Sequence, residues 1–477
     1  MNAVLLKELR QSVRNRYVLA AYLIFIVVLL TVAGTQISSA VSAARDGPYS
    51  LFYAGRTFFL TLHGIFAVLG ICFIPAYVLI RIVRERWWTD IDLAYVTPMP
   101  PSALLLGKFG SALAMTGLFL SAVLPFLALS YFIGGIDVLT ITVSVILTLE
   151  LVAILTLGAI LLAIAPMPKI LRGVAVLGYA ALLWILASGW KENTSAPSSD
   201  GYMSVFAERD SCILLVEIML VGLSAAGLLY AGALAGFCSV NVDRMRPFRI
   251  LATALFAGWG IVSAFQSRLA YFKEMPQVWA ILFMLFAAGM LVVGLSERTE
   301  PGTYLLQRRP RARVWRVLGY PFRTGQFNAV CWSALLLAIG IALSYVIFPA
   351  AETLTEWCSE CRGKHPFPCN AAGGEPVLIF TLNISGYALT MLALWHYSLR
   401  SRRVPCAALW WVTGLIIVLS SVIFISLNES GVKGVNYCIG NLFAEKREVL
   451  PWLYGWNAFA LASLIPAVVV HFRRIRE

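Results

Sequence analysis

Long apolar segments, separated by shorter polar ones, follow each other along most of the chain. Each is about as long as the ~20 residues that an α-helix needs to cross the hydrocarbon core of a bilayer. We predict about twelve membrane-spanning helices, at Tyr17–Ala43, Ala54–Ile80, Ser111–Gly134, Val138–Ala165, Ile170–Gly189, Cys212–Phe237, Ile250–Gln266, Val278–Leu295, Ala329–Phe348, Val377–Leu399, Ala407–Leu427 and Leu450–Val470. The pattern therefore predicts an all-α polytopic membrane protein.

The charged residues between these segments predict an orientation. With the N-terminus in the cytoplasm, 26 of the 37 Lys and Arg residues fall on the cytoplasmic side, against 8 of the 24 acidic residues. Because Lys and Arg concentrate in cytoplasmic loops, we expect both termini to be cytoplasmic, in a multi-pass protein of the plasma or inner membrane. Membrane lipids then account for the net charge of +13, and no nucleic-acid partner is expected.

The composition excludes a soluble globular protein. Hydrophobic residues make up 60% of the chain and charged residues 13%, about half the charged share of a typical soluble domain. The chain also offers no convergent set of acids, nucleophiles or metal ligands. We therefore expect neither an enzyme nor a resident metal.

The first sixteen residues predict an amphipathic helix at the cytoplasmic interface. Apolar residues recur at helical spacing, and basic residues occupy another face; they are Leu5, Leu9 and Val13 on the first face and Lys7, Arg10 and Arg14 on the second. Such a helix places its basic face toward anionic headgroups. A simple positively charged anchor is the alternative interpretation.

The segment Arg81–Gly110, between the second and third predicted spans, combines charged and proline-rich parts. Its charged residues precede an apolar stretch, and Pro98, Pro100 and Pro101 then interrupt any helix before Ser102 begins another. We predict a short helix parallel to the membrane, a turn, and then the third span. An element of this kind could bind a cytoplasmic partner through its charges.

Two motifs resemble those of a known family, the permease subunits of ABC-2 type ABC transporters. Lys7-Glu8-Leu9-Arg10 is similar to the first motif of that family, within its N-terminal interfacial helix. The second motif follows the second span and is matched, in order, by Glu85-Arg86, Asp92, Val96-Thr97-Pro98, Pro101 and Leu104-Leu105-Leu106-Gly107-Lys108. The chain departs from the family at Trp87-Trp88 and at Thr89-Asp90. The resemblance covers residues 1–237.

The resemblance implies a six-helix permease unit at residues 1–237 and a separate P-loop ATP-binding cassette subunit as partner. That subunit would dock on the 81–110 loop, through Glu85, Arg86, Asp92, Thr97 and Pro98. This chain has no G-x-x-x-x-G-K-[ST] motif for phosphate binding, so ATP would be bound and hydrolysed on the partner and no cofactor is expected here.

The resemblance further implies export, with another copy or a second permease in the complex. An ion-coupled secondary transporter and a non-transporting scaffold of a larger membrane complex are the alternative functions.

Residues 238–477 form a second predicted six-helix unit, interpreted either as a divergent repeat of the first or as an accessory bundle. Its largest cytoplasmic loop, Glu297–Gln326, again follows the second helix of the unit. Seven arginines lie in this loop: Arg298, Arg308, Arg309, Arg311, Arg313, Arg316 and Arg323. We expect them to fix the orientation and to bind anionic lipid.

Two acidic residues lie inside predicted spans, where a charge is costly. Glu150 is near the middle of its span, and Glu217 is closer to the external end. His63 has a similar outer depth and could pair with Glu217. These three residues are candidates for a polar lining, or alternatively for a buried hydrogen-bonded pair.

Four cysteines lie in predicted external loops: Cys358, Cys361, Cys369 and Cys438. An even number in an oxidising compartment favours two disulfides, with three alternative pairings. The spacing of the first three, with His365 between them, would also fit a zinc site.

Overall fold

The computed structural model shows a helical protein that divides into two compact units, Met1–Ser239 and Val240–Glu477. It describes residues 3–46, 48–87, 100–134, 136–165, 169–195, 209–238, 243–266, 275–294, 297, 319–347, 382, 385–386, 388–390, 392–393, 453 and 455–466. Of these residues 93% are helical, and none lies in a strand. The all-α fold class is confirmed for this part of the chain.

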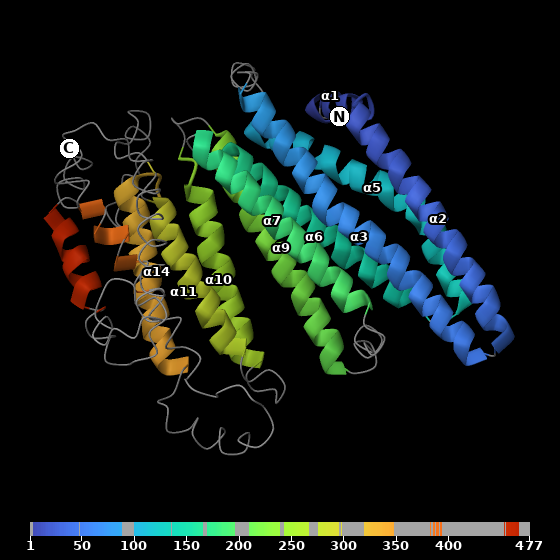
Figure 1. Ribbon diagram of the computed structural model, residues 1–477. Helices are drawn as coiled ribbons and strands as arrows, with labels where there is room; N and C mark the ends of the chain where they lie inside the picture. The colour runs from blue at the N-terminus through green and yellow to red at the C-terminus, as the bar shows by residue number, and fades with distance from the viewer. Residues whose placement is uncertain are drawn as a thin grey trace, which may run out of the picture. The chain divides into compact units, whose positions relative to one another are not determined.

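The first unit contains seven described helices (Figure 1). They are α1 (Ala3–Val13), α2 (Arg16–Asp46), α3 (Pro48–Trp87), α5 (Pro101–Ile133), α6 (Val138–Ile164), α7 (Lys169–Ser195) and α9 (Arg209–Phe237). Proline stands at the first position of α5, where its missing N–H leaves no hydrogen bond unmade. The same helix ends at Gly134, whose φ of 102° is a conformation that glycine adopts without strain.

The core of the first unit forms around α3, which contacts α2, α5, α6 and α7. Phe58, Leu62 and Phe66 of this helix are fully buried. On α5, the buried ring of Phe119 meets the rings of Phe25 and Phe73 edge to face, an arrangement that aromatic pairs prefer. A movement of α3 would therefore disturb the packing of four neighbouring helices.

Seven described helices are long and apolar enough to cross a membrane, which indicates an integral membrane protein. Their spanning segments are Arg16–Ser42, Phe52–Glu85, Pro101–Ile133, Val138–Ile164, Leu215–Phe237, Arg246–Phe265 and Gln326–Leu343. Two further predicted spans coincide with shorter apolar helices, at Ala175–Ser188 and Val278–Leu291. Of the last three predicted spans, Val377–Leu399 lies largely and Ala407–Leu427 wholly outside the described residues, and Leu450–Val470 is described only at 453 and 455–466. The count of twelve and the cytoplasmic position of both termini stay predictions.

The helices on either side of the 81–110 loop are longer than predicted. α3 continues seven residues past the predicted end at Ile80, and α5 begins at Pro101, ten residues before Ser111. The sequence placed these boundaries where charged residues begin. The helices instead continue through these charged residues, several of which pair with one another. Residues 88–99 of the loop lie outside the described part.

The second unit contains α10 (Arg246–Gln266), α11 (Met275–Gly294) and α14 (Gln326–Ile347). α11 contacts both α10 and α14. A Cβ atom at Gly294 would lie 2.6 Å from the Cβ of Ala329, so the absence of a side chain there lets α11 and α14 approach closely. The other described helical residues of this unit are 382, 385–386, 388–390, 392–393, 453 and 455–466.

Candidate functional site

The polar face of α1 points into the first unit. Glu8, Gln11 and Ser12 lie three to four residues apart and so share one face of the helix. Glu8 and Ser12 are buried, although they belong to a helix predicted to lie at the membrane interface. A buried carboxylate requires a nearby cation to compensate its charge.

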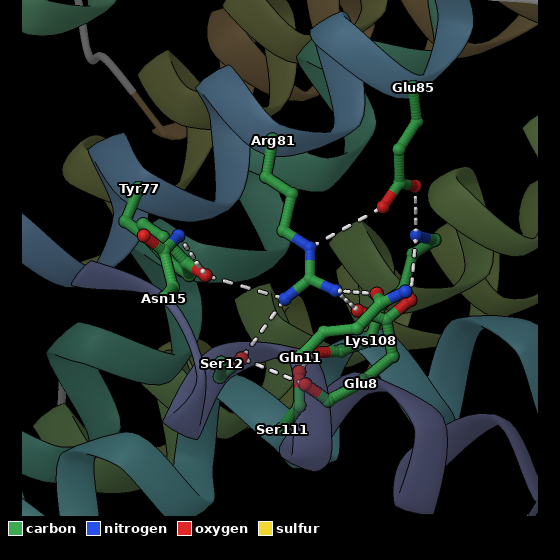
Figure 2. Close-up of polar contacts among 9 residues, drawn as sticks. All are labelled: Glu8, Gln11, Ser12, Asn15, Tyr77, Arg81, Glu85, Lys108 and Ser111. Atoms are coloured by element: carbon green, nitrogen blue, oxygen red, sulfur yellow. Dashed lines mark hydrogen bonds and ion pairs between the residues drawn. The ribbon is translucent and has the colours of Figure 1, made fainter. Parts of the chain in front are cut away.

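Four charged side chains from three helices form a closed ring, which we name the charged junction (Figure 2). Glu8 of α1 pairs with Arg81 of α3 at 2.5 Å and with Lys108 of α5 at 3.2 Å. Glu85 of α3 pairs with the same two cations, at 3.4 Å from Arg81 Nε and 2.5 Å from Lys108 Nζ. Acids and bases alternate around the ring, so the junction has no net charge.

Neutral side chains complete the surroundings of Arg81. Its guanidinium donates to the Gln11 side-chain oxygen, to Ser12 Oγ at 3.0 Å and to the Tyr77 hydroxyl at 3.4 Å. Asn15, at the break between α1 and α2, donates to the same hydroxyl at 3.2 Å. The interactions of Arg81 thus attach the second half of α1 to the end of α3.

Two glycines of α5 let α1 lie directly against that helix. A Cβ atom at Gly107 would come within 2.6 Å of Val4 Cγ1 and 3.2 Å of the Leu5 backbone nitrogen, and one at Gly110 within 3.2 Å of Leu5 Cδ1. In Leu104–Lys108, therefore, the glycine provides close contact with α1 and the lysine provides a charge for Glu8. The motif Lys7–Arg10 and the motif Leu104–Lys108 are thus in direct contact, through the ion pair between Glu8 and Lys108.

Burial makes the junction sensitive to the loss of any one member. The side chains of Glu8 and Lys108 are each only 7% exposed, and those of Arg81 and Glu85 are 18% and 25% exposed. Removing one partner of a buried ion pair leaves an uncompensated charge, which typically costs about 3–5 kcal/mol. The four paired charges together therefore hold α1, α3 and α5 in one arrangement.

The predicted docking residues are only partly described. The carboxylate of Glu85 is engaged in the junction, and Arg86 belongs to α3, with its side chain outside the described residues. Asp92, Thr97 and Pro98 also lie outside them. Their role in docking stays a prediction, as do the short parallel helix and the turn expected there.

The three polar residues predicted within spans occupy two places in the first unit. His63 of α3 is buried, contacts Thr148 Oγ1 of α6 at 3.0 Å and stacks on Phe59. Thr148 was not among the sequence-predicted residues. Glu150 lies two residues after Thr148 and therefore on a different face of α6. Its carboxyl group lies against Gly222 of α9. Glu217 lies on α9, and its pairing with His63 stays a prediction.

The second unit has a buried charge pair of its own. Arg249, at the start of α10, pairs with Glu297, which follows α11 in the chain. Arg249 also donates to the carbonyl oxygens of Pro321, at 3.0 Å, and Arg323, and Gly325 N–H donates to Glu297 at 2.8 Å. Burial raises the pKa of the Glu297 carboxyl, and the Arg249 guanidinium acts in the opposite direction.

The two buried networks occupy corresponding places in their units. Each joins the end of one long helix to the start of the next: Glu85 pairs with Lys108 of α5, and Glu297, after α11, accepts from Gly325 N–H just before α14. Sequence reasoning missed both networks, although Glu8 and Lys108 are part of the motifs that it used. Of the seven arginines predicted to bind lipid, Arg323 is described, and its carbonyl oxygen accepts from Arg249.

The four external cysteines and His365 lie outside the described residues, so both the disulfides and the alternative zinc site stay predictions. Within the described part of the chain, Cys72 and Cys331 are free thiols. In the same part, no group of three or more His, Cys, Asp or Glu side chains is arranged to hold a metal ion.

Comparison with protein-family models, with curated proteins and with solved structures finds no match to this chain.

Proposed function

We propose that the chain is the membrane-spanning permease subunit of an ABC-2 type, ATP-driven transporter, which acts as an exporter in the plasma or inner membrane. In this proposal the chain has about twelve spans and cytoplasmic termini, and a separate P-loop subunit hydrolyses ATP. The subunit docks on the segment between α3 and α5. The observation that carries the proposal is the charged junction, which joins both flanks of that segment to α1.

The junction supports the proposal because it would transmit a movement of the docking segment to α1, α3 and α5. Residues 88–100 connect the end of α3, two residues after Glu85, to the start of α5, seven residues before Lys108. Glu85 and Lys108 are paired across this gap, so the two flanks act as one body. A partner that displaces the segment would therefore move α3, α5 and α1 together.

The consequence inside the membrane follows from the packing of α3. This helix contacts α2, α5, α6 and α7, and packed interfaces of this kind tend to switch between discrete arrangements instead of deforming continuously. ATP-driven movement at the cytoplasmic end would then change the packing of the whole unit. Alternating access to a path between the helices is the expected result.

Charge reversal in the docking segment tests this proposal. We expect Asp92→Lys to abolish co-purification of a P-loop ATP-binding subunit with the tagged full-length chain, because a docking contact becomes repulsive. The matched control is Asp46→Lys at the end of α2, on the opposite predicted side of the membrane, which should leave co-purification unchanged. Asp92 is preferable to Glu85 for this test because reversal at Glu85 would also break the junction.

Two outcomes would contradict the proposal. If no P-loop ATPase accompanies the wild-type chain and transport by vesicles follows an ion gradient without ATP, the chain is a secondary transporter. If an ATP-binding subunit binds equally well to the wild-type chain and to the Asp92→Lys variant, the segment is not the docking surface.

A further inference from the structure

A groove lies along the first unit at the level of Glu150. It is formed by α6, α9 and one residue of α5, and its volume is about 780 Å³. Small-molecule sites commonly measure roughly 300–1,000 Å³. Ile146, Leu220 and Leu223, which line the groove, are exposed residues of membrane-spanning helices. The groove is therefore open at the surface of the first unit.

The lining of the groove is apolar except at the Glu150 carboxyl group and the Tyr230 hydroxyl. Its residues are Phe109, Ile146, Leu149, Glu150, Ala153, Leu157, Met219, Leu220, Leu223, Ala226, Gly227 and Tyr230. Of these described residues, Glu150 alone has a side chain that can carry a charge near neutral pH. A ligand that fits this surface has an apolar body and a single cationic group.

The backbone of α9 is shaped to admit the Glu150 side chain. A Cβ atom at Gly222 would lie 2.5 Å from Glu150 Oε1 and 2.8 Å from its Cδ, so any larger residue would displace the carboxyl group. The carboxyl also lies within hydrogen-bonding reach of the Leu223 backbone amide. These contacts hold the carboxyl at the wall of the groove, near the middle of α6.

The dimensions indicate the shape of the ligand. Along α9 the lining runs from Met219 to Tyr230, which is about 16 Å at the helical rise per residue. Glu150 lies beside Gly222, closer to the first end of this stretch. An extended alkyl or aryl chain can therefore lie toward Phe109 and Tyr230 while its cationic end meets the carboxylate.

We propose that this groove binds a lipophilic ammonium cation, taken up laterally from the bilayer, with its ammonium group on Glu150. A carboxylate among apolar side chains is costly, and an ammonium group compensates that charge. Binding itself does not depend on the transport role. That the bound cation is the exported substrate rests on the proposed function.

Direct binding of dodecylamine tests the site. The full-length chain is reconstituted in phosphatidylcholine nanodiscs, and retention of radiolabelled dodecylamine is measured without ATP or a partner subunit, with empty discs subtracted. We expect saturable binding to the wild-type chain and an affinity roughly tenfold or more lower for Glu150→Gln, since the ammonium loses its charged partner. Dodecanol, with the same chain and no charge, should bind both proteins equally weakly.

Two further variants separate loss of charge from loss of fold. Glu217→Gln removes a carboxyl from α9 outside the groove lining, and it should bind dodecylamine like the wild type. Gly222→Leu displaces the Glu150 side chain and should reduce binding as strongly as Glu150→Gln. Both variants should elute as monodisperse discs.

Three results would overturn the proposal. Equal dodecylamine affinity in the wild type and Glu150→Gln would show that the carboxylate takes no part. Equal affinity of the wild type for dodecanol and dodecylamine would assign the groove to lipid chains. Disulfide cross-linking of a Leu223→Cys variant to a second copy, with no bound amine, would make the groove a subunit interface. None of these outcomes bears on whether an ATPase docks on residues 81–110.

Discussion

Replacing Lys108 by methionine removes one cation from the charged junction while it keeps an unbranched apolar side chain that is only one atom shorter. Lys108 Nζ pairs with Glu8 at 3.2 Å and with Glu85 at 2.5 Å. In the variant, Arg81 alone would face both carboxylates, and the junction would carry a net charge of −1. The helical contact of α5 with α1 at Gly107 is left in place.

The expected loss follows from the burial of the partners. Breaking a buried ion pair by removing one member typically costs about 3–5 kcal/mol. Glu8 is nearly inaccessible, with 7% of its side chain exposed, whereas Glu85 is 25% exposed and can still be reached by water. Because Arg81 also remains in contact with both acids, we expect the lower end of this range, about 3 kcal/mol in the free energy of unfolding.

Unfolding in mixed micelles of a mild detergent and dodecyl sulfate measures this loss, with tryptophan fluorescence and circular dichroism as probes. The matched control is Arg84→Met, which removes an exposed cation from the same end of α3. We expect the control to change the free energy of unfolding by less than about 0.5 kcal/mol, as is usual for surface substitutions.

A double variant distinguishes the ion pairs from a general effect of the substitution. Glu8→Gln combined with Lys108→Met leaves the Arg81–Glu85 pair and no unmatched buried charge. We therefore expect the double variant to be no less stable than Lys108→Met alone, with an interaction energy of at least about 1 kcal/mol. Additive losses, or a Lys108→Met variant as stable as the Arg84→Met control, would refute this account of the junction.

Two other substitutions test the contacts around these networks. Gly107→Leu should lower the free energy of unfolding by about 1–3 kcal/mol through overpacking against Val4, and a second substitution, Val4→Gly, should recover part of the loss in the same unfolding assay. Arg249→Met should leave Glu297 buried without its cation. Because burial raises the pKa of that carboxyl, the stability of the variant should be highest at low pH, where the acid is neutral, and should fall as the pH rises through this raised pKa and the acid ionises; pH-independent stability of this variant would contradict the assignment.

The helices of the first unit follow closely from the order of apolar and polar residues. Predicted and observed starts coincide for the fourth span, at Val138, and both place the end of the sixth span at Phe237. The largest differences are at the charged ends of α3 and α5. There the hydropathy pattern stops at the first ionisable residue, but the helix continues because Arg81, Glu85 and Lys108 neutralise one another.

The candidate site was predictable only in part. The motifs containing Glu8 and Lys108 were recognised in the sequence, and Glu85 was interpreted as a contact for a partner. That these residues pair with each other could not be read from the motifs, since Glu8 and Lys108 are 100 residues apart in the chain. Glu150 was likewise identified as an unusual charge, but the groove around it depends on the position of Gly222 on another helix.

The amino-acid sequence by itself determined that this chain forms long apolar helices. That conclusion is local, because in a bilayer each backbone N–H and C=O must find its partner within the same segment, and a run of apolar residues is sufficient to specify such a helix. Only the tertiary structure decided which charges neutralise each other and which glycines admit a neighbouring side chain. Those pairings depend on the packing of several helices at once, and their members lie far apart in the chain.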